Sequence, residues 1–213
     1  MRNEKCCPMT SSQSTIITNL RYPWLKPRVA FSSLINENWN KGGSIVTEQP
    51  TLISVSKVED ARGYFQKFLD PRKLCHHGIA KFQALEMFST STKKYGIRGM
   101  HIQVSPHQSR KIVWVGSGEI LDVLVDVISG EVYTFELHEN SELVLYIPPN
   151  FAHGFQAMAD GTQVNYVTDA RYNKECDTGF NPFSFGFKWP KPVSVLSERD
   201  QKLMDFEGFC ERT

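Results

Sequence analysis

The alternation of hydrophobic and polar residues predicts a β-rich domain from Thr51 onward. Short runs of β-branched and aromatic residues are separated by turn residues at intervals of about ten, which is typical of a sandwich or barrel and not of βαβ units. Residues 121–127 and 132–137, joined through the turn residues 129–131, predict a hairpin with one face toward the core. Further strands are predicted at 112–115, 143–147 and 163–168.

Helix signals are few. Asp70 followed by Pro71 is typical of an N-cap and the first residue of a helix. Ser197 and Asp200 have the spacing of a capping box, which predicts a short C-terminal helix. The sequence therefore predicts an all-β domain with a few short helices.

The N-terminal part of the chain differs in hydrophobic pattern and in composition. Residues 1–48 show no sustained hydrophobic period and contain Ser, Thr, Asn and Pro throughout. We predict an N-terminal extension over residues 1–48 and one domain over residues 49–213. Trp24, Phe31 and Trp39 favour an extension that packs on the domain, since disordered tails are usually poor in aromatic residues.

Composition argues against several classes of protein. The 24 basic and 23 acidic side chains leave a net charge of +1, so the chain has no overall field to hold nucleic acid or an anionic membrane. No apolar run approaches the roughly 20 residues that span a bilayer, and the N-terminus lacks the apolar stretch of a secretory signal. Five cysteines without a CxxC motif argue against a disulfide framework and a structural zinc site. We therefore expect a cytoplasmic protein without nucleic-acid or membrane partners.

Two histidines stand in the segments that are richest in chemically active residues. His101 lies in the segment 96–103, where Gln103 falls on the same face of the predicted strand, so both side chains can point into the mouth of a barrel. His153 lies beside Gly154 in a second such segment. Two histidines at strand edges indicate one shared site.

These two segments belong to an ordered series of motifs. The series comprises Asp60-Ala61-Arg62-Gly63-Tyr64-Phe65, Arg98-Gly99-Met100-His101-Ile102-Gln103, Lys111-Ile112-Val113, Gly118-Glu119-Ile120-Leu121-Asp122-Val123, Ile147-Pro148, Phe151-Ala152-His153-Gly154-Phe155, Tyr166 to Tyr172, Trp189-Pro190 and Leu196-Ser197-Glu198-Arg199-Asp200. In this order and spacing, over roughly Ile53 to Asp200, the chain resembles the dTDP-4-dehydrorhamnose 3,5-epimerase family. The resemblance implies a metal-independent, cofactor-free cupin, which is a double-stranded β-helix or jelly-roll barrel. It also implies a homodimer that acts on a nucleotide-linked 4-keto-6-deoxy sugar.

The resemblance further implies a role for each matching residue. His101 matches the catalytic base, Asp200 the carboxylate paired with it, and Lys111 the cation beside the sugar ketone. Tyr166 matches the acid on the opposite face of the sugar, and Tyr172 an aromatic residue at the nucleotide end. The residues expected to contact the substrate are Arg62, Phe65, Arg98, Gln103, His153 and Tyr172.

The expected chemistry by itself needs these residue types. A proton α to a ketone is removed near neutral pH only when a base lies within hydrogen-bond reach and the enolate oxygen is stabilised electrostatically. Histidine suits the first task and lysine the second, while a carboxylate behind the imidazole fixes its tautomer. Epimerisation then needs a proton from the other face, which a tyrosine can supply. The forked donors of Arg62 and Arg98 suit phosphate oxygens.

Each assignment has a purely structural alternative. Asp200 can cap the amides of its own helix, and His153 can bond backbone in a tight turn. Lys111 can be a solvated lysine, and Tyr166 can be a core aromatic residue with its hydroxyl at the rim. The arginines can lie on the surface. Four histidines outside the motifs are expected on the surface: His76, His77, His107 and His138.

Three alternatives for the function stay open. A metal-dependent cupin is disfavoured because Gln103 stands where the second histidine of an HxH metal motif would be. A ketoisomerase would use the same base but would not need Tyr166, and a non-catalytic sugar-nucleotide binder would need neither His101 nor Lys111. The sugar and the nucleotide are also open, since Glu86-Met87-Phe88 replaces a Gln-x-Asn stretch that is common in the family.

Overall fold

The computed structural model describes residues 48–79 and 82–212. The predicted N-terminal extension, residues 1–48, lies outside this part of the chain except for Glu48. The expectation that Trp24, Phe31 and Trp39 pack on the domain lies outside it as well.

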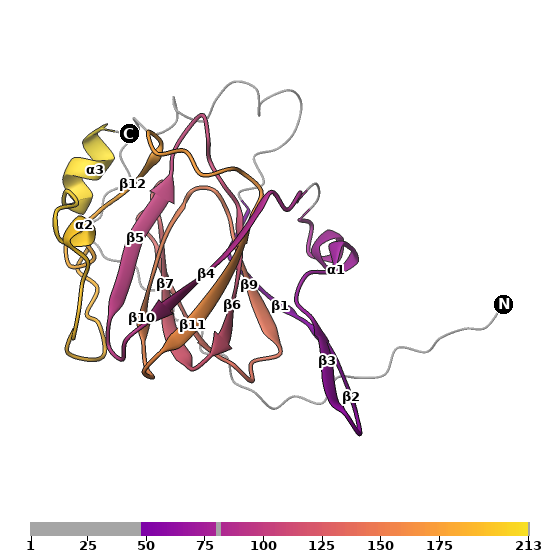
Figure 1. The fold of residues 1–213 in the computed structure, drawn as a ribbon. Helices are drawn as coiled ribbons and strands as arrows, with labels where there is room; N and C mark the ends of the chain where they lie inside the picture. Colours follow the sequence, from indigo (N-terminus) through magenta and orange to yellow (C-terminus); the bar gives the residue numbers. More distant parts are fainter. Residues whose placement is uncertain (1–47, 80–81, 213) are drawn as a thin grey trace, which may run out of the picture.

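Two antiparallel sheets form a barrel at the centre of the molecule (Figure 1). The first sheet has the order β1 (Thr51–Ser54), β9 (Leu143–Ile147), β6 (Lys111–Ser117), β11 (Thr162–Thr168) and β4 (Glu86–Thr92). The second sheet has the order β12 (Asp177–Gly179), β5 (Ile97–Gln103), β10 (Phe151–Ala157), β7 (Glu119–Asp126) and β8 (Val132–His138). A separate hairpin of β2 (Ser56–Asp60) and β3 (Gly63–Lys67) projects from the barrel (Figure 1). The prediction of an all-β domain is confirmed.

The individual strand predictions are confirmed as well. The predicted strand 112–115 lies within β6, 143–147 is β9, and 163–168 lies within β11. The predicted hairpin is formed by β7 and β8, in which Val125 pairs with Val132 across the turn.

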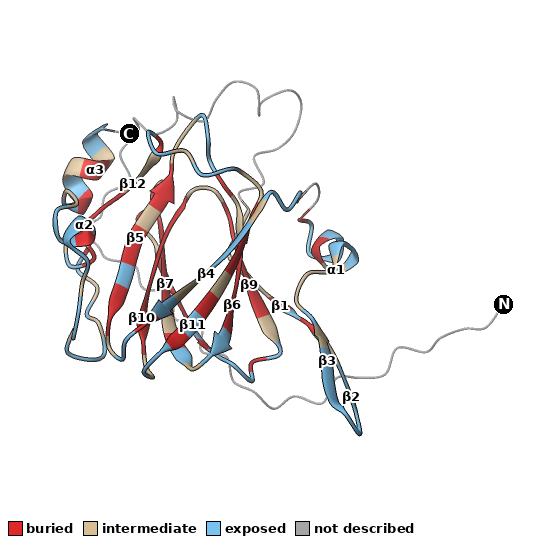
Figure 2. Cartoon of the chain, viewed as in Figure 1, coloured by how far each residue is buried: buried red, intermediate tan, exposed pale blue. Residues whose placement is uncertain are grey.

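One face of this hairpin points toward the core, as predicted, and the opposite face of β7 is covered as well. Leu124 points into the barrel and belongs to its core. Val123 and Val125 point the other way and pack in a second cluster with Phe209 of the C-terminal helix α3 (Phe206–Arg212). Figure 2 accordingly shows most of β7 as buried, whereas the β2–β3 hairpin is largely exposed.

The helix α1 (Pro71–His76) begins as predicted. The Asp70 carboxylate caps it by accepting a hydrogen bond of 3.0 Å from the Arg72 amide, and the proline occupies the first turn, where no amide hydrogen is needed. Leu74 is buried and packs with Trp114 on the outer face of the first sheet. Within residues 48–79 and 82–212, no helix has both the length and the apolar character needed to cross a membrane.

Two glycines allow the strands β5, β10 and β12 to pack closely together around His101. Gly179 of β12 pairs with His101 of β5, and a Cβ atom at Gly179 would lie 1.8 Å from the Met100 carbonyl oxygen. A Cβ atom at Gly154 of β10 would lie 2.8 Å from the Arg98 carbonyl oxygen. Since neither position has room for a side chain, the glycines are what allow β5 to be held closely between β10 and β12.

Candidate active site

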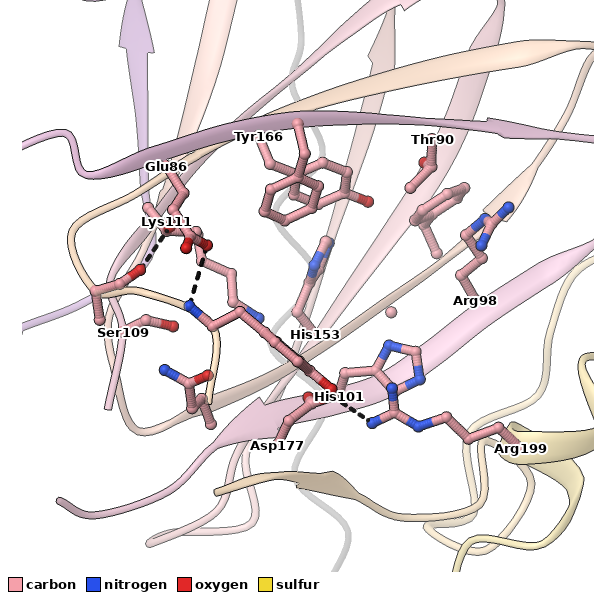
Figure 3. A pocket seen from close by; sticks show the side chains of 17 residues that line it. Glu86, Thr90, Arg98, His101, Ser109, Lys111, His153, Tyr166, Asp177 and Arg199 are labelled. Carbon is pink, nitrogen blue, oxygen red and sulfur yellow. Dashed lines mark hydrogen bonds and ion pairs between the residues drawn. The ribbon is translucent and has the colours of Figure 1, made fainter. Parts of the chain in front are cut away.

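A cavity of about 260 Å³ lies between the two sheets. Its walls come from β4, β6 and β11 on one side and from β5, β10 and β12 on the other, with a contribution from the short helix α2 (Glu198–Gln201) (Figure 3). The residues that line it are Glu86, Phe88, Thr90, Arg98, His101, Gln103, Ser109, Lys111, His153, Gly154, Phe155, Tyr166, Thr168, Ala170, Tyr172, Asp177 and Arg199.

Most of the residues predicted for the site meet at this cavity. His101, Lys111, Tyr166, Arg98, Gln103, His153 and Tyr172 line it, and Asp200 lies directly behind His101. Arg62 and Phe65 do not: both lie on the projecting β2–β3 hairpin, where the Arg62 side chain is 90% exposed and pairs with Asp60 at 2.6 Å. The four histidines predicted for the surface, His76, His77, His107 and His138, are exposed, which confirms that prediction.

His101 forms the first of two pairs of a histidine with a buried carboxylate. Its Nε2 atom lies 2.7 Å from the Asp200 carboxylate, which is 2% exposed and also faces the Gly99 amide at 3.4 Å. The sequence left open whether this carboxylate only caps its helix. In the structure the Ser197 hydroxyl caps α2 by accepting the Asp200 amide at 3.0 Å, and the Asp200 carboxylate itself faces His101. This leaves Nδ1 of the imidazole for a proton from a bound molecule.

The Asp200 carboxyl is suited to stabilise a protonated imidazole. Burial on its own would raise the pKa of this carboxyl, but the hydrogen bond to His101, the imidazolium charge and the Gly99 amide hold the pKa below its ordinary value. The group is therefore ionised at neutral pH, and its charge can stabilise the imidazolium that forms when His101 accepts a proton.

His153 forms the second pair, which the sequence did not reveal. Its Nε2 atom lies 2.9 Å from Asp122 of β7, and the two residues are 5% and 0% exposed. Since His153 stands opposite His101 in the β5–β10 ladder, the two pairs lie side by side. The other carboxylate oxygen of Asp122 has no hydrogen-bond partner among the described residues. The available signal was an acidic residue flanked by apolar residues in the middle of a strand.

Lys111 stands at the start of β6 and points into the cavity (Figure 3). Burial lowers the pKa of its ammonium group to about 8, although the carboxylates of Asp177 and Asp122 act in the opposite direction. No described residue accepts a hydrogen bond from this ammonium group. Lys111 is thus a cation at neutral pH whose donors are available to a ligand.

Tyr166 of β11 stands on the opposite wall from His101 (Figure 3). It is 6% exposed, and its ring stacks on Phe88 with 4.8 Å between centroids. Burial, with the charge of Asp122, raises the pKa of the phenol well above its ordinary value, while Thr90 and Arg98 offset part of this rise. The phenol therefore keeps its proton and can act as a donor.

Several further lining residues were not assigned from the sequence. Asp177 of β12 pairs with Arg199 of α2 at 2.8 Å, close to His101 (Figure 3). Glu86 of β4 accepts the Tyr172 amide at 3.0 Å. In the described part of the chain, no three His, Cys, Asp or Glu side chains come together as a metal site. Arg199 lay within a matched motif, but its pairing depends on strand β12, which no sequence pattern places nearby.

Known proteins of one family are similar to this chain over most of its length. The sequence model of the family described as dTDP-4-dehydrorhamnose 3,5-epimerase matches residues 47–208. A dTDP-4-dehydrorhamnose 3,5-epimerase of Sinorhizobium fredii is 31% identical over 166 residues, covering 74% of this chain and 85% of that protein. The corresponding protein of Methanothermobacter thermautotrophicus is 32% identical over 160 residues, covering 70% and 85%.

The fold is also shared. The crystal structure of dTDP-4-dehydrorhamnose 3,5-epimerase from Sulfolobus tokodaii superposes with a TM-score of 0.69 at 29% identity, covering 77% of this chain and 94% of that one. The barrel is thus the cupin double-stranded β-helix that the sequence predicted. Because the family model matches residues 47–208, which is most of the chain, the chain belongs to the dTDP-4-dehydrorhamnose 3,5-epimerase family of isomerases.

Proposed function

We propose that this isomerase epimerises a nucleotide-linked 4-keto-6-deoxy sugar at C3, C5 or both, by removing an α proton and returning a proton to the opposite face. The observation that carries the proposal is the placement of two proton-transfer groups on opposite walls. His101, backed by Asp200, stands on the second sheet, and the protonated phenol of Tyr166 stands on the first (Figure 3).

Each step has a residue suited to it. The proton leaves the carbon next to the ketone for His101, and the Asp200 carboxylate stabilises the imidazolium that forms. The negative charge that develops on the ketone oxygen is met by the ammonium group of Lys111 in a largely dehydrated site, where such stabilisation is strongest. Tyr166 then donates its proton to the other face of the carbon, which inverts the centre.

The same geometry weighs against the two alternatives. A ketoisomerase moves the carbonyl along the ring and needs no acid opposite the base, so it does not explain the buried phenol of Tyr166. A non-catalytic binder does not explain a base held at 2.7 Å from a buried carboxylate. The predicted cytoplasmic location, the division at residues 48 and 49 and the expected absence of metals, cofactors, nucleic acid and membrane remain predictions.

Tyr166→Phe separates epimerisation from proton removal. We expect the variant to lose inversion by about 10²-fold or more, because the donor on the far face is gone, while deuterium from D2O still enters from the His101 face with retention. Proton NMR of the sugar reports both quantities in one sample. The matched control is Tyr133→Phe, which removes a tyrosine hydroxyl that bonds Glu131 away from the cavity and is expected to invert at close to the wild-type rate. Inversion by Tyr166→Phe at the wild-type rate would exclude Tyr166 as the acid.

The position of Arg62 and Phe65 supports the predicted homodimer. Both belong to the expected substrate contacts, yet they lie on a hairpin outside the cavity of their own chain. The same hairpin exposes Val58, Tyr64 and Phe65 by 63%, 66% and 62%, and apolar clusters of this kind commonly mark interaction surfaces. We therefore propose a homodimer in which the hairpin of one copy reaches the cavity of the other.

Mixing two inactive variants tests this arrangement. His101→Asn damages the cavity and leaves the hairpin intact, whereas a chain with Arg62→Ala and Phe65→Ala has the reverse defect. If the hairpin acts in the partner, a mixed dimer contains one intact site, and random exchange of chains restores about a quarter of wild-type activity. A mixture that stays inactive, although mass spectrometry shows mixed dimers, would mean that the hairpin does not complete the cavity of the partner.

A further inference from the structure

Both ends of the Gln103 amide are already occupied by the protein. Its Nε2 group donates to the carbonyl oxygens of Arg171, at 3.1 Å, and of His107. Its Oε1 atom accepts the Asn173 amide at 2.9 Å. Two carbonyl acceptors on one end and an N–H donor on the other fix which end is nitrogen. With its two hydrogens engaged and only 8% of the residue exposed, Gln103 has little left to offer a substrate.

We propose that Gln103 is a positioning residue, which holds the segment 171–173 so that Tyr172 stands at the edge of the cavity, and that it is not the substrate contact expected from the sequence. This inference rests on the proposed function. Two of the three backbone groups that Gln103 bonds lie immediately before and after Tyr172, so the glutamine holds that residue from both sides.

Other contacts of this segment fit the same role. Glu86 accepts the amide of Tyr172 itself at 3.0 Å. The Asn173 side chain accepts the amides of Glu175 and Cys176 at 3.0 and 3.1 Å, which carries the ordered turn on toward β12. The Tyr172 side chain is largely free of neighbours, since the residue is 62% exposed. Its backbone therefore decides where the ring stands, and holding the backbone lowers the entropy lost when a ligand stacks on the ring.

The strand that carries the base also carries this positioning residue. His101 and Gln103 are two residues apart on β5, so they lie on one face, and β12 pairs with both through Gly179 and Asp177. Gln103 thus fixes the backbone that carries the Tyr172 ring at a set place relative to the base. Because the ring is expected at the nucleotide end, its loss affects ground state and transition state alike, which raises KM and leaves kcat little changed.

The test compares Gln103→Met with Gln156→Met. Gln156 is a matched control because it is buried on β10 and makes the same kinds of bond, donating to the carbonyls of Tyr95 and Lys191 and accepting the Lys191 amide at 3.2 Å, but it does not line the cavity. We expect Gln103→Met to weaken dTDP binding and raise KM by about tenfold, with kcat within about twofold of wild type. Gln156→Met is expected to lower thermal stability only.

Two further measurements decide whether the effect passes through Tyr172. In a Tyr172→Ala background, Gln103→Met is expected to weaken dTDP binding no further, since coupled residues are not additive. The Asn173 amide hydrogen is expected to exchange with solvent faster in Gln103→Met and at the wild-type rate in Gln156→Met. Additive losses, a fall in kcat at unchanged KM, or unchanged Asn173 exchange would overturn the inference. A wild-type protein that neither binds dTDP nor exchanges substrate protons would overturn the proposed function instead, and Asn173 exchange would still show whether Gln103 holds the segment.

Discussion

The His101→Asn variant is expected to lower kcat/KM by about 10²- to 10⁴-fold and to stop deuterium from entering the sugar. Asparagine can keep a hydrogen bond to Asp200, but its amide cannot accept a proton from carbon near neutral pH. The loss should fall on the chemical step, because the variant lacks the imidazole Nδ1, which the pairing of Nε2 with Asp200 leaves for a substrate proton. Single-turnover rates and proton NMR in D2O measure it directly.

A matched histidine variant controls for this substitution. His138→Asn changes an exposed histidine at the end of β8, outside the cavity, and is expected to exchange protons at the wild-type rate. Thermal unfolding of both variants shows whether the barrel is intact. If folded His101→Asn still exchanged protons at the wild-type rate, His101 would not be the base, and the buried pair of His153 and Asp122 would take its place as the candidate.

Lys111→Met is expected to remove activity and to stabilise the fold. Loss of the cation that meets the enolate oxygen should lower kcat by about 10²- to 10³-fold. Burial lowers the pKa of the ammonium group from 10.5 to about 8, so a charged Lys111 in the folded protein is unfavourable at neutral pH. Replacing it with an apolar side chain of similar length should raise the unfolding free energy by about 1 to 3 kcal/mol.

The pH dependence of this effect has a defined sign. Between about 8 and 10.5 the unfolded chain binds a proton on Lys111 that the folded chain has released, so wild-type stability from this group rises with pH across that window. The advantage of Lys111→Met is therefore largest at neutral pH and fades as the pH approaches 10.5. Over the same window wild-type kcat should fall, because the cation is lost.

Denaturant unfolding and kcat, both measured across the pH range, test these expectations. Lys188→Met is the control, since Lys188 is exposed and lies outside the cavity. A Lys111→Met protein that was less stable than wild type at neutral pH would contradict the account of the buried charge. A wild-type rate without an alkaline decline near the pKa of Lys111 would contradict its role as the cation.

The sequence was informative about individual strands and less informative about which distant segments pack on them. The strands at 112–115 and 143–147 were predicted because β propensity and turn residues are local properties. The hairpin β7–β8 was expected to bury one face, yet Phe206 and Phe209 cover the other. That contact joins the middle of the chain to its end, and no local pattern contains it.

The candidate site shows the same difference between what local motifs reveal and what long-range contacts decide. His101, Lys111 and Tyr166 were found through a series of motifs, and the barrel brings them to one cavity. Asp122 lay within a matched motif but had no assigned role, because its importance depends on a 2.9 Å contact with a strand about thirty residues away. Arg62 was predicted with the site, but it lies on the exposed β2–β3 hairpin outside the cavity, a position that motif order does not reveal.

The measurement that tests the central claim most directly is proton NMR of the wild-type protein with dTDP-4-keto-6-deoxyglucose in D2O. The account predicts that deuterium enters C3, C5 or both and that signals of the inverted sugar appear, with both processes depending on His101. No deuterium at either carbon, with the protein folded and the nucleotide sugar bound, would contradict it.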